Sequence, residues 1–176
     1  MNESKVMMEG GASRGAVYAG TFDPMTKGHL DVAERAARTF SPLIIAVAAM
    51  PKKHLMFSVE ERVALAKACL AHLPNVQVMP FDGLLVDWTR QHGIHVIIRG
   101  LRAFSDFEYE FQMALTNRRL APDLETYFLM PAPSFSFVSS SMVREIAELH
   151  GDVDPFAPPV VAKALRERYP LGAGKS

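Results

Sequence analysis

The segment 20–29 holds a histidine and two glycines in an arrangement that suits phosphate chemistry. Gly20 permits a tight turn, and Gly28 leaves room for a ligand to approach the backbone where a helix is expected to begin. Free N–H groups at such a helix end favour phosphate. The imidazole of His29 can donate a hydrogen bond to a phosphoryl oxygen that gains negative charge during a reaction. A turn with a solvated histidine is the alternative, but the complete segment after a strand favours nucleotide binding.

A second cluster follows the fourth expected strand, where Gly100 and Leu101 separate Arg99 from Arg102. Two guanidinium groups at the exit of a strand can act as forks for phosphate, although surface arginines are common. Glu110 lies on the helix expected to follow. Its carboxylate can accept hydrogen bonds from a ribose or a purine, and a solvated helix face is the alternative interpretation.

The third cluster follows the fifth expected strand and contains the consecutive serines 139–141. One hydroxyl is enough to cap the next helix, so the other two, together with Arg144 one turn later, exceed what a cap requires. They can donate to phosphates instead. Lys52 and Lys53 follow the second expected strand and add positive charge, although a lysine pair is usually part of a solvated loop.

Short apolar runs alternate with stretches of helical period from residue 16 onward. This alternation predicts an α/β fold, a Rossmann-like doubly wound sheet of five parallel strands with C-terminal helices. Patterns that resemble capping boxes at 58–61 and 105–108 mark two helix starts. Ligands are expected at the carboxyl ends of the strands. The strands are expected at 16–19, 43–49, 76–79, 94–98 and 125–130, and the helices at 29–40, 58–73, 84–92, 105–119, 140–150 and 159–169.

The composition describes one domain, expected at 15–170 between an N-terminal tail, 1–14, and a C-terminal tail, 171–176. The chain has 176 residues, 49% of them hydrophobic, and 19 basic against 19 acidic side chains. Zero net charge provides no general attraction to nucleic acid or an anionic membrane, so neither is an expected partner. No export signal or membrane span is expected. A single cysteine, Cys69, excludes an intramolecular disulfide and a multi-thiolate metal centre, and it fits a cytoplasmic location.

Together these segments resemble the nucleotidylyltransferase superfamily, whose motifs T/H-x-G-H and I-S-S-S/T-x-x-R correspond to 26–29 and 138–144 here. Within that superfamily the chain is most similar to phosphopantetheine adenylyltransferases. Ala19 and Val138 replace the usual proline and isoleucine of these motifs. The similarity extends from about residue 16 to residue 165. Its further motifs stand at 18–24, 57–62, 98–102, 106–110 and 128–131.

The resemblance implies transfer of the adenylyl group of ATP to 4'-phosphopantetheine, which gives dephospho-CoA and pyrophosphate in coenzyme A biosynthesis. It implies a cytoplasmic homohexamer and Mg²⁺ that arrives with ATP, with no metal site of the protein's own. It also implies that His29 stabilises the transition state and that Lys53 and Arg102 assist catalysis. The implied acceptor-binding residues are Thr21, Lys53, Leu85 and Arg99. Lys52 is the alternative to Lys53, and the distance back from Met56 and Phe57 favours Lys53. The implied ATP-binding residues are Thr21, Phe22, His29, Gly100, Leu101, Arg102, Glu110, Phe135, Ser136, Phe137, Val138, Ser139, Ser140 and Ser141.

The acceptor phosphate is largely dianionic near neutral pH because its second pKa is about 6, so its attack needs no general base. Direct in-line attack without a covalent intermediate is therefore expected. The nearest alternative is another nucleotidylyltransferase whose acceptor is a different phosphate, such as nicotinamide mononucleotide. A non-catalytic nucleotide sensor or an RNA-binding module is the alternative from another class. Zero net charge disfavours the RNA module.

Overall fold

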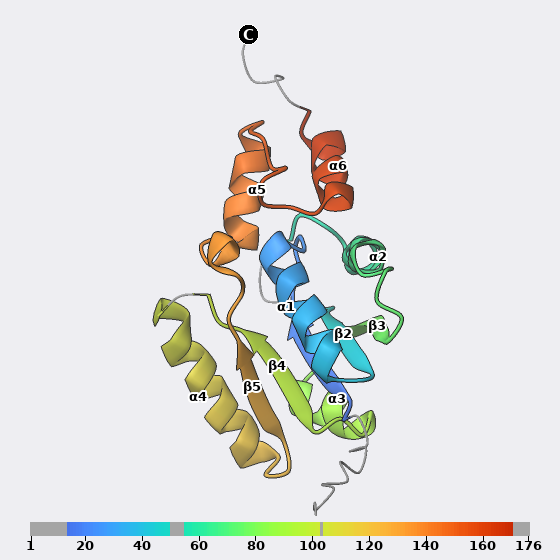
Figure 1. The fold of residues 1–176 in the computed structure, drawn as a ribbon, viewed down its shortest axis with the longest axis vertical. Coiled ribbons are helices and arrows are strands. Elements are labelled where there is room, and N and C mark those ends of the chain that lie inside the picture. Colours follow the sequence, from blue (N-terminus) through green and yellow to red (C-terminus); the bar gives the residue numbers. More distant parts are fainter. Residues whose placement is uncertain (1–13, 50–54, 103, 171–176) are drawn as a thin grey trace, which may run out of the picture.

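The computed structural model describes residues 14–49, 55–102 and 104–170. Five parallel strands form one sheet in the order β3-β2-β1-β4-β5 (Figure 1). This confirms the Rossmann-like α/β fold that the alternating pattern predicts. Of the expected tails, 1–14 and 171–176, only residue 14 is among the described residues. The strands are β1 (Ala16–Gly20), β2 (Leu43–Ala48), β3 (Val76–Phe81), β4 (Val96–Gly100) and β5 (Glu125–Leu129).

Helices cover both faces of the sheet, because alternate residues of each strand point to opposite sides. Tyr18 of β1 packs into an apolar cluster with α1, α2, α5 and α6, whereas its neighbour Val17 packs with α3. Burial on both faces explains why β2 is apolar without interruption. The helices are α1 (Lys27–Thr39), α2 (Val59–Cys69), α3 (Leu85–Gln91), α4 (Phe104–Leu120), the short 3-10 helix η1 (Pro133–Phe135), α5 (Ser140–Glu148) and α6 (Pro159–Arg168).

The order of the strands reverses between β1 and β4, which lie side by side at the centre of the sheet. From β1 the chain continues through α1 to β2 on one side, and it returns to β4 on the other. Such a reversal leaves a crevice at the carboxyl ends of the two strands, where ligands bind in open parallel sheets. Helices α5 and α6 stand beyond these carboxyl ends (Figure 1). The residues at this edge of the sheet are therefore the first candidates for a site.

Some expected boundaries differ from the observed ones for local reasons. Helix α2 ends at Cys69 rather than near Leu73, and the chain leaves it in a turn in which the N–H of Leu73 donates to the carbonyl of Leu70. Strand β4 begins two residues later than expected, because the N–H of Ile94 closes α3 by donating to the carbonyl of Thr89. The capping box of α2 is confirmed, since Ser58 and Glu61 exchange hydrogen bonds. The expected cap at Ser105 is wrong, because Ser105 lies inside α4.

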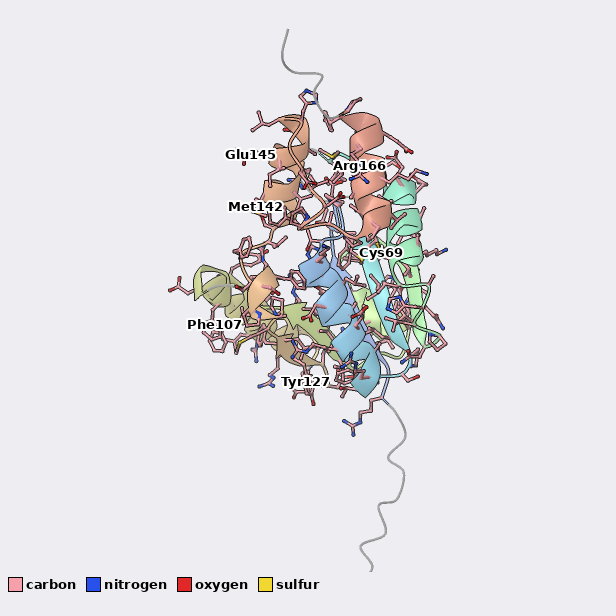
Figure 2. The ribbon with its side chains drawn as sticks, turned by 45° about the horizontal axis from the view of Figure 1, so that its top comes forward. Cys69, Phe107, Tyr127, Met142, Glu145 and Arg166 are labelled. Atoms are coloured by element: carbon pink, nitrogen blue, oxygen red, sulfur yellow. The ribbon has the colours of Figure 1, made fainter. Side chains whose placement is uncertain are left out.

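Helix α4 lies beside β5 at the edge of the sheet (Figure 1). Several of its large apolar side chains are exposed. Phe107, Phe111 and Leu115 follow one another at helical spacing and are each more than 40% exposed. The rings of Phe107 and Phe111 stack with their centroids 5.5 Å apart. Figure 2 shows Phe107 at the outer margin of the molecule. These three side chains are called the α4 stripe below.

Within the described residues, no helix combines the length and the apolar character that crossing a membrane requires.

Candidate active site

The first turn of α1 is fixed by a reciprocal capping box between Thr26 and His29. The Thr26 hydroxyl accepts a hydrogen bond from the backbone N–H of His29 at 3.3 Å. In return, Nδ1 of His29 accepts from the backbone N–H of Thr26 at 3.1 Å. A histidine here takes the place that glutamate or glutamine usually has in a capping box. The geometry of the helix start therefore sets the orientation of the imidazole.

This hydrogen bond also determines which ring nitrogen of His29 carries the proton. A neutral imidazole has one donor and one acceptor nitrogen, and Nδ1 is engaged as an acceptor. The proton therefore resides on Nε2. The ring is further held by Phe22, which contacts it edge-on with centroids 5.2 Å apart. His29 thus presents an N–H donor of fixed direction.

Burial and two neighbouring cations keep His29 neutral. Burial, Arg102 and Arg99 together lower the pKa of His29 from its ordinary value of 6.5 to about 4. The neutral form therefore predominates at pH 7. A neutral N–H donor can stabilise a developing phosphoryl charge while the adjacent arginines supply the positive charge.

A small cleft is lined by residues of the first and second sequence clusters and by Val138, which directly precedes the three serines. His29 lies in this cleft with Gly100 and Arg102, which come from the end of β4 and the residues after it. Val138, directly before the three serines, completes the lining from the loop that leads to α5. Nη1 of Arg102 donates to the Val138 carbonyl at 3.3 Å. Segments that are far apart in the sequence therefore converge on one cleft. Its other lining residues are Tyr18, Thr26, Gly28, Val32 and Pro131.

The three serines each have a structural partner, which corrects the expectation that two of them exceed a structural role. Ser139 caps α5 by accepting from the N–H of Met142 at 3.0 Å. Ser140 donates to the carbonyl of Pro24 at 2.8 Å. Ser141 accepts from Nη2 of Arg144 at 3.2 Å. The hydroxyls thus fix the start of α5 and connect it to the loop after β1.

Arg144 likewise has a structural partner in that loop. Its Nη1 donates to the backbone carbonyl of Asp23 and lies 3.6 Å from the Asp23 carboxylate, which is almost fully buried. The carboxylate accepts from the N–H groups of Met56 and Phe57, at 2.8 and 2.9 Å. Asp23 therefore connects the loop after β1 to the start of α5 and to the segment before α2. Sequence reasoning did not single out Asp23.

Arg99 and Glu110 form a bidentate ion pair. Nε and Nη2 of Arg99 donate to the two carboxylate oxygens, both at 2.7 Å, and Nη1 donates to the carbonyl of Ala19 at 2.6 Å. Burial alone would lower the pKa of Arg99, but Glu110 raises it, so the guanidinium remains charged. Arg99, which is expected to bind the acceptor, is therefore in direct contact with Glu110, which is expected to bind ATP. Three of the five N–H groups of Arg99 are engaged, which leaves two for a ligand.

The remaining expected site residues lie around the same edge of the sheet, except Lys53, whose position is not described. Thr21 follows β1, and the ring of Phe22 is buried, so Phe22 can meet a ligand only through its backbone. A Cβ on Gly20 would lie 2.9 Å from that ring, so Gly20 makes room for Phe22. Lys53 lies outside the described residues. The others are placed as follows: Leu85 opens α3, Leu101 follows β4, Phe135 ends η1, and Ser136 and Phe137 form the turn after it.

Arg62 is a second polar residue that sequence reasoning did not identify. It is 1% exposed, and it shares the buried face of α2 with Ala66 and Cys69. A charged residue in register with apolar positions of a helix is the signal that would have revealed it.

The sequence profile of the cytidylyltransferase-like family matches residues 17–146, which is most of the chain. The chain belongs to the cytidylyltransferase-like family. It is therefore a nucleotidyltransferase that binds nucleotides, as the three sequence clusters indicate. The matched range includes both the Thr26–His29 and the Val138–Arg144 motifs.

Two solved structures share the fold at low sequence identity. One is a proposed nicotinate-nucleotide adenylyltransferase from Vibrio parahaemolyticus, with a TM-score of 0.66 and 16% identity over 89% of this chain and 93% of that one. The other is nicotinic acid mononucleotide adenylyltransferase of Plasmodium falciparum complexed with NaAD, with a TM-score of 0.64 and 15% identity over 90% and 96% of the two chains. At this level of identity the likeness establishes the fold.

Among the residues that the structure describes, no group of three or more His, Cys, Asp or Glu side chains is placed to hold a metal ion.

We predict that the imidazole of His29 titrates near pH 4 in the folded protein. Between pH 6.5 and 4 the unfolded chain binds more protons at this residue than the folded chain does. The stability that neutral His29 contributes is therefore complete above pH 6.5 and is lost as the pH falls through about 4. NMR titration of the ring carbon resonances measures this pKa directly.

An Arg102→Met variant is the control for this titration. Removing one of the two neighbouring cations should raise the pKa of His29, but only part of the way to 6.5, because burial is the larger cause. A His29 pKa at or above 6.5 in the wild-type protein would contradict the site geometry described above.

Proposed function

We propose that the protein is a pantetheine-phosphate adenylyltransferase. The observation that carries the proposal is the convergence of His29, Arg102 and the loop before the three serines on one cleft. The order and spacing of the motifs along the chain support phosphopantetheine as the acceptor. On this proposal the enzyme transfers the adenylyl group of ATP to 4'-phosphopantetheine and releases dephospho-CoA and pyrophosphate.

The proposed reaction is a direct in-line displacement at the α-phosphorus of ATP. An oxygen of the acceptor phosphate forms a bond to this phosphorus, and the bond from phosphorus to the oxygen that bridges the α- and β-phosphates breaks. The electron pair leaves with pyrophosphate. Since the acceptor is already an anion, no side chain has to remove a proton from it. The protein has to position two anions against each other and offset their charge.

His29 is proposed to donate from Nε2 to the α-phosphate as its negative charge grows. The capping box fixes the ring before substrate arrives, so the donor needs no reorganisation during the reaction. Arg102 lies in the same cleft and is proposed to offset phosphate charge. Gly100, Leu101, Glu110 and the loop 135–141 are proposed to complete the ATP site with Thr21 and Phe22.

The acceptor is proposed to bind to Thr21, Lys53, Leu85 and Arg99. Arg99 keeps its charge next to Glu110, and two of its N–H groups are not used by Glu110 or Ala19. Glu110 therefore orients the guanidinium for a phosphate.

Mg²⁺ is proposed to enter with ATP, held by the phosphate oxygens rather than by a dedicated set of side chains. When bound, the ion would offset the charge of the phosphates. Cytoplasmic location is part of the same proposal, as is binding of the product dephospho-CoA or of CoA.

A second candidate acceptor is nicotinate mononucleotide. Both similar solved structures are named as adenylyltransferases of this nucleotide, which favours it. That acceptor also presents a phosphate, so the cleft chemistry would be the same. The two acceptors differ in the group beyond the phosphate, a pantetheine arm or a pyridine nucleoside.

We predict that pyrophosphate release with ATP depends on 4'-phosphopantetheine. The assay compares ATP with CTP, each against phosphopantetheine, nicotinate mononucleotide and nicotinamide mononucleotide. Turnover with either mononucleotide and none with phosphopantetheine would refute the proposed acceptor. ATP binding without turnover of any acceptor would favour a nucleotide sensor instead.

We predict that His29→Ala lowers kcat about a hundredfold or more, because one preorganised donor contributes roughly 3 kcal/mol in the transition state. The dissociation constant for ATP should change much less, since the donor acts mainly on charge that develops during the reaction. His72→Ala is the control. His72 follows the C-terminal end of α2, is exposed and pairs with Glu34, and it does not line the cleft. A kcat within twofold of wild type in His29→Ala would remove this residue from the mechanism.

We propose a homohexamer in which the α4 stripe is covered by another copy. Exposed apolar side chains at regular helical spacing are typical of a surface that another chain covers. Burial of the stripe would also fix α4, which carries Glu110.

We predict that a Phe107→Ser, Phe111→Ser double variant has a lower molecular mass in solution than wild type. Analytical ultracentrifugation measures this mass. Leu149→Ser is the matched control, since Leu149 is an apolar side chain that is 75% exposed and outside the stripe. A wild-type monomer, or an unchanged assembly in the double variant, would contradict this mode of assembly.

A further inference from the structure

Arg62 donates hydrogen bonds to three backbone carbonyls from a buried position in α2. Its Nη1 lies 2.7 Å from the carbonyl oxygen of Thr21 and 2.8 Å from that of Ala48. Its Nε lies 3.2 Å from the carbonyl oxygen of Phe57. The side chain is 1% exposed. One guanidinium therefore connects three separate segments of the chain.

Two of these carbonyls lie at the edge of the sheet where substrates are proposed to bind. Thr21 directly follows β1, and Ala48 is the last residue of β2. Thr21 is proposed to bind both the acceptor and ATP. Arg62 thus sets the distance between Thr21 and the end of β2, whereas none of its three acceptors belongs to β4 or to the loop before α5.

The backbone after Thr21 has a conformation that needs support. Phe22 has a φ of +49°, a region that non-glycine residues rarely adopt. Such a conformation persists only where the surroundings hold it, and it is frequent at functional sites. Arg62 holds the carbonyl on one side of Phe22, and the buried carboxylate of Asp23 is held on the other side by Met56 and Phe57.

The third nitrogen of the guanidinium indicates that Arg62 is more than a packing residue. Nη2 is buried and has no hydrogen-bond partner among the described residues. A buried donor without an acceptor is unfavourable. Features that weaken the fold in this way are expected where they serve a site.

We propose that Arg62 is a positioning residue for the acceptor: it holds Thr21 at a fixed place relative to the end of β2, so that Thr21 can bind the acceptor phosphate. This inference rests on the proposed function, since it assumes a phosphate-bearing acceptor on this side of the cleft. Thr21 and Phe22 are proposed for the ATP site as well, but the other proposed ATP-binding residues lie at and after the end of β4, on α4 and in the loop 135–141, and Arg62 donates to none of their carbonyls. Loss of the guanidinium should therefore affect the acceptor more than ATP.

The test is an Arg62→Lys variant, which keeps the charge but cannot bridge the same carbonyls. The KM for the acceptor should rise about tenfold to a hundredfold, because small misplacements of a binding group have effects of this size. The KM for ATP should stay within about threefold. The acceptor used here is whichever one the wild-type protein turns over in the pyrophosphate assay. If that acceptor is a mononucleotide, the proposed function is refuted, but the effect of Arg62→Lys on the KM for the acceptor can still be measured. Equal increases in both KM values, or no increase, would overturn the inference.

Arg168→Lys is the matched control. Arg168 also contacts the segment before α2, since it donates to the carbonyl of Met56, bonds Glu61 at 3.0 Å and lies 4.6 Å above the ring of Phe57. It makes none of the contacts to Thr21 or Ala48 that Arg62 makes. The acceptor KM should be unchanged in this variant. An increase equal to that in Arg62→Lys would assign the effect to the segment before α2 and overturn the role of Thr21.

A measurement on the wild-type protein keeps the inference testable if Arg62→Lys does not fold. The Nε–H of Arg62 is buried and gives an NMR signal that can be followed while each substrate is added. This signal should shift more with the acceptor than with ATP. A larger shift with ATP, or no shift with either substrate, would overturn the inference.

Discussion

The reciprocal hydrogen bonds between Thr26 and His29 are the interaction on which the account of the site depends. They stabilise the first turn of α1 and orient the imidazole, and they place its proton on Nε2. The adjacent arginines and burial then keep the ring neutral. The proposed catalytic donor is thus part of the start of a helix, so that folding of α1 also orients the imidazole.

Around this helix start, many of the charged and hydroxyl residues in the motifs contact one another. Ser140 and Arg144 hold the loop after β1 from the side of α5, while Arg62 holds it from the side of α2. These contacts converge on Thr21, Asp23 and Pro24, whose positions the strand alone does not determine. The chemistry proposed for the cleft therefore requires a rigid loop more than it requires many groups that touch substrate.

The sequence predicted the parallel α/β sheet and most of its elements, because apolar period and turn residues are local signals. It also predicted that the segments containing His29, Arg102 and Val138 lie close together, because the carboxyl ends of parallel strands share one edge of the sheet. It could not predict the partners of Ser140 and Arg144, since these lie more than 100 residues away along the chain. The burial of Arg62 and the pairing of Arg99 with Glu110 also depend on tertiary packing. The acceptor-binding role of Lys53 stays a prediction, because that residue lies outside the described part.

The protonation state of His29 is the most direct test of the account. ¹⁵N NMR of the imidazole at pH 7 distinguishes the two neutral tautomers from the charged ring. The capping box and the burial of the ring predict a neutral imidazole with the proton on Nε2, and with Nδ1 showing the shift of a nitrogen that accepts a hydrogen bond. A proton on Nδ1, or a charged ring at pH 7, would contradict this geometry.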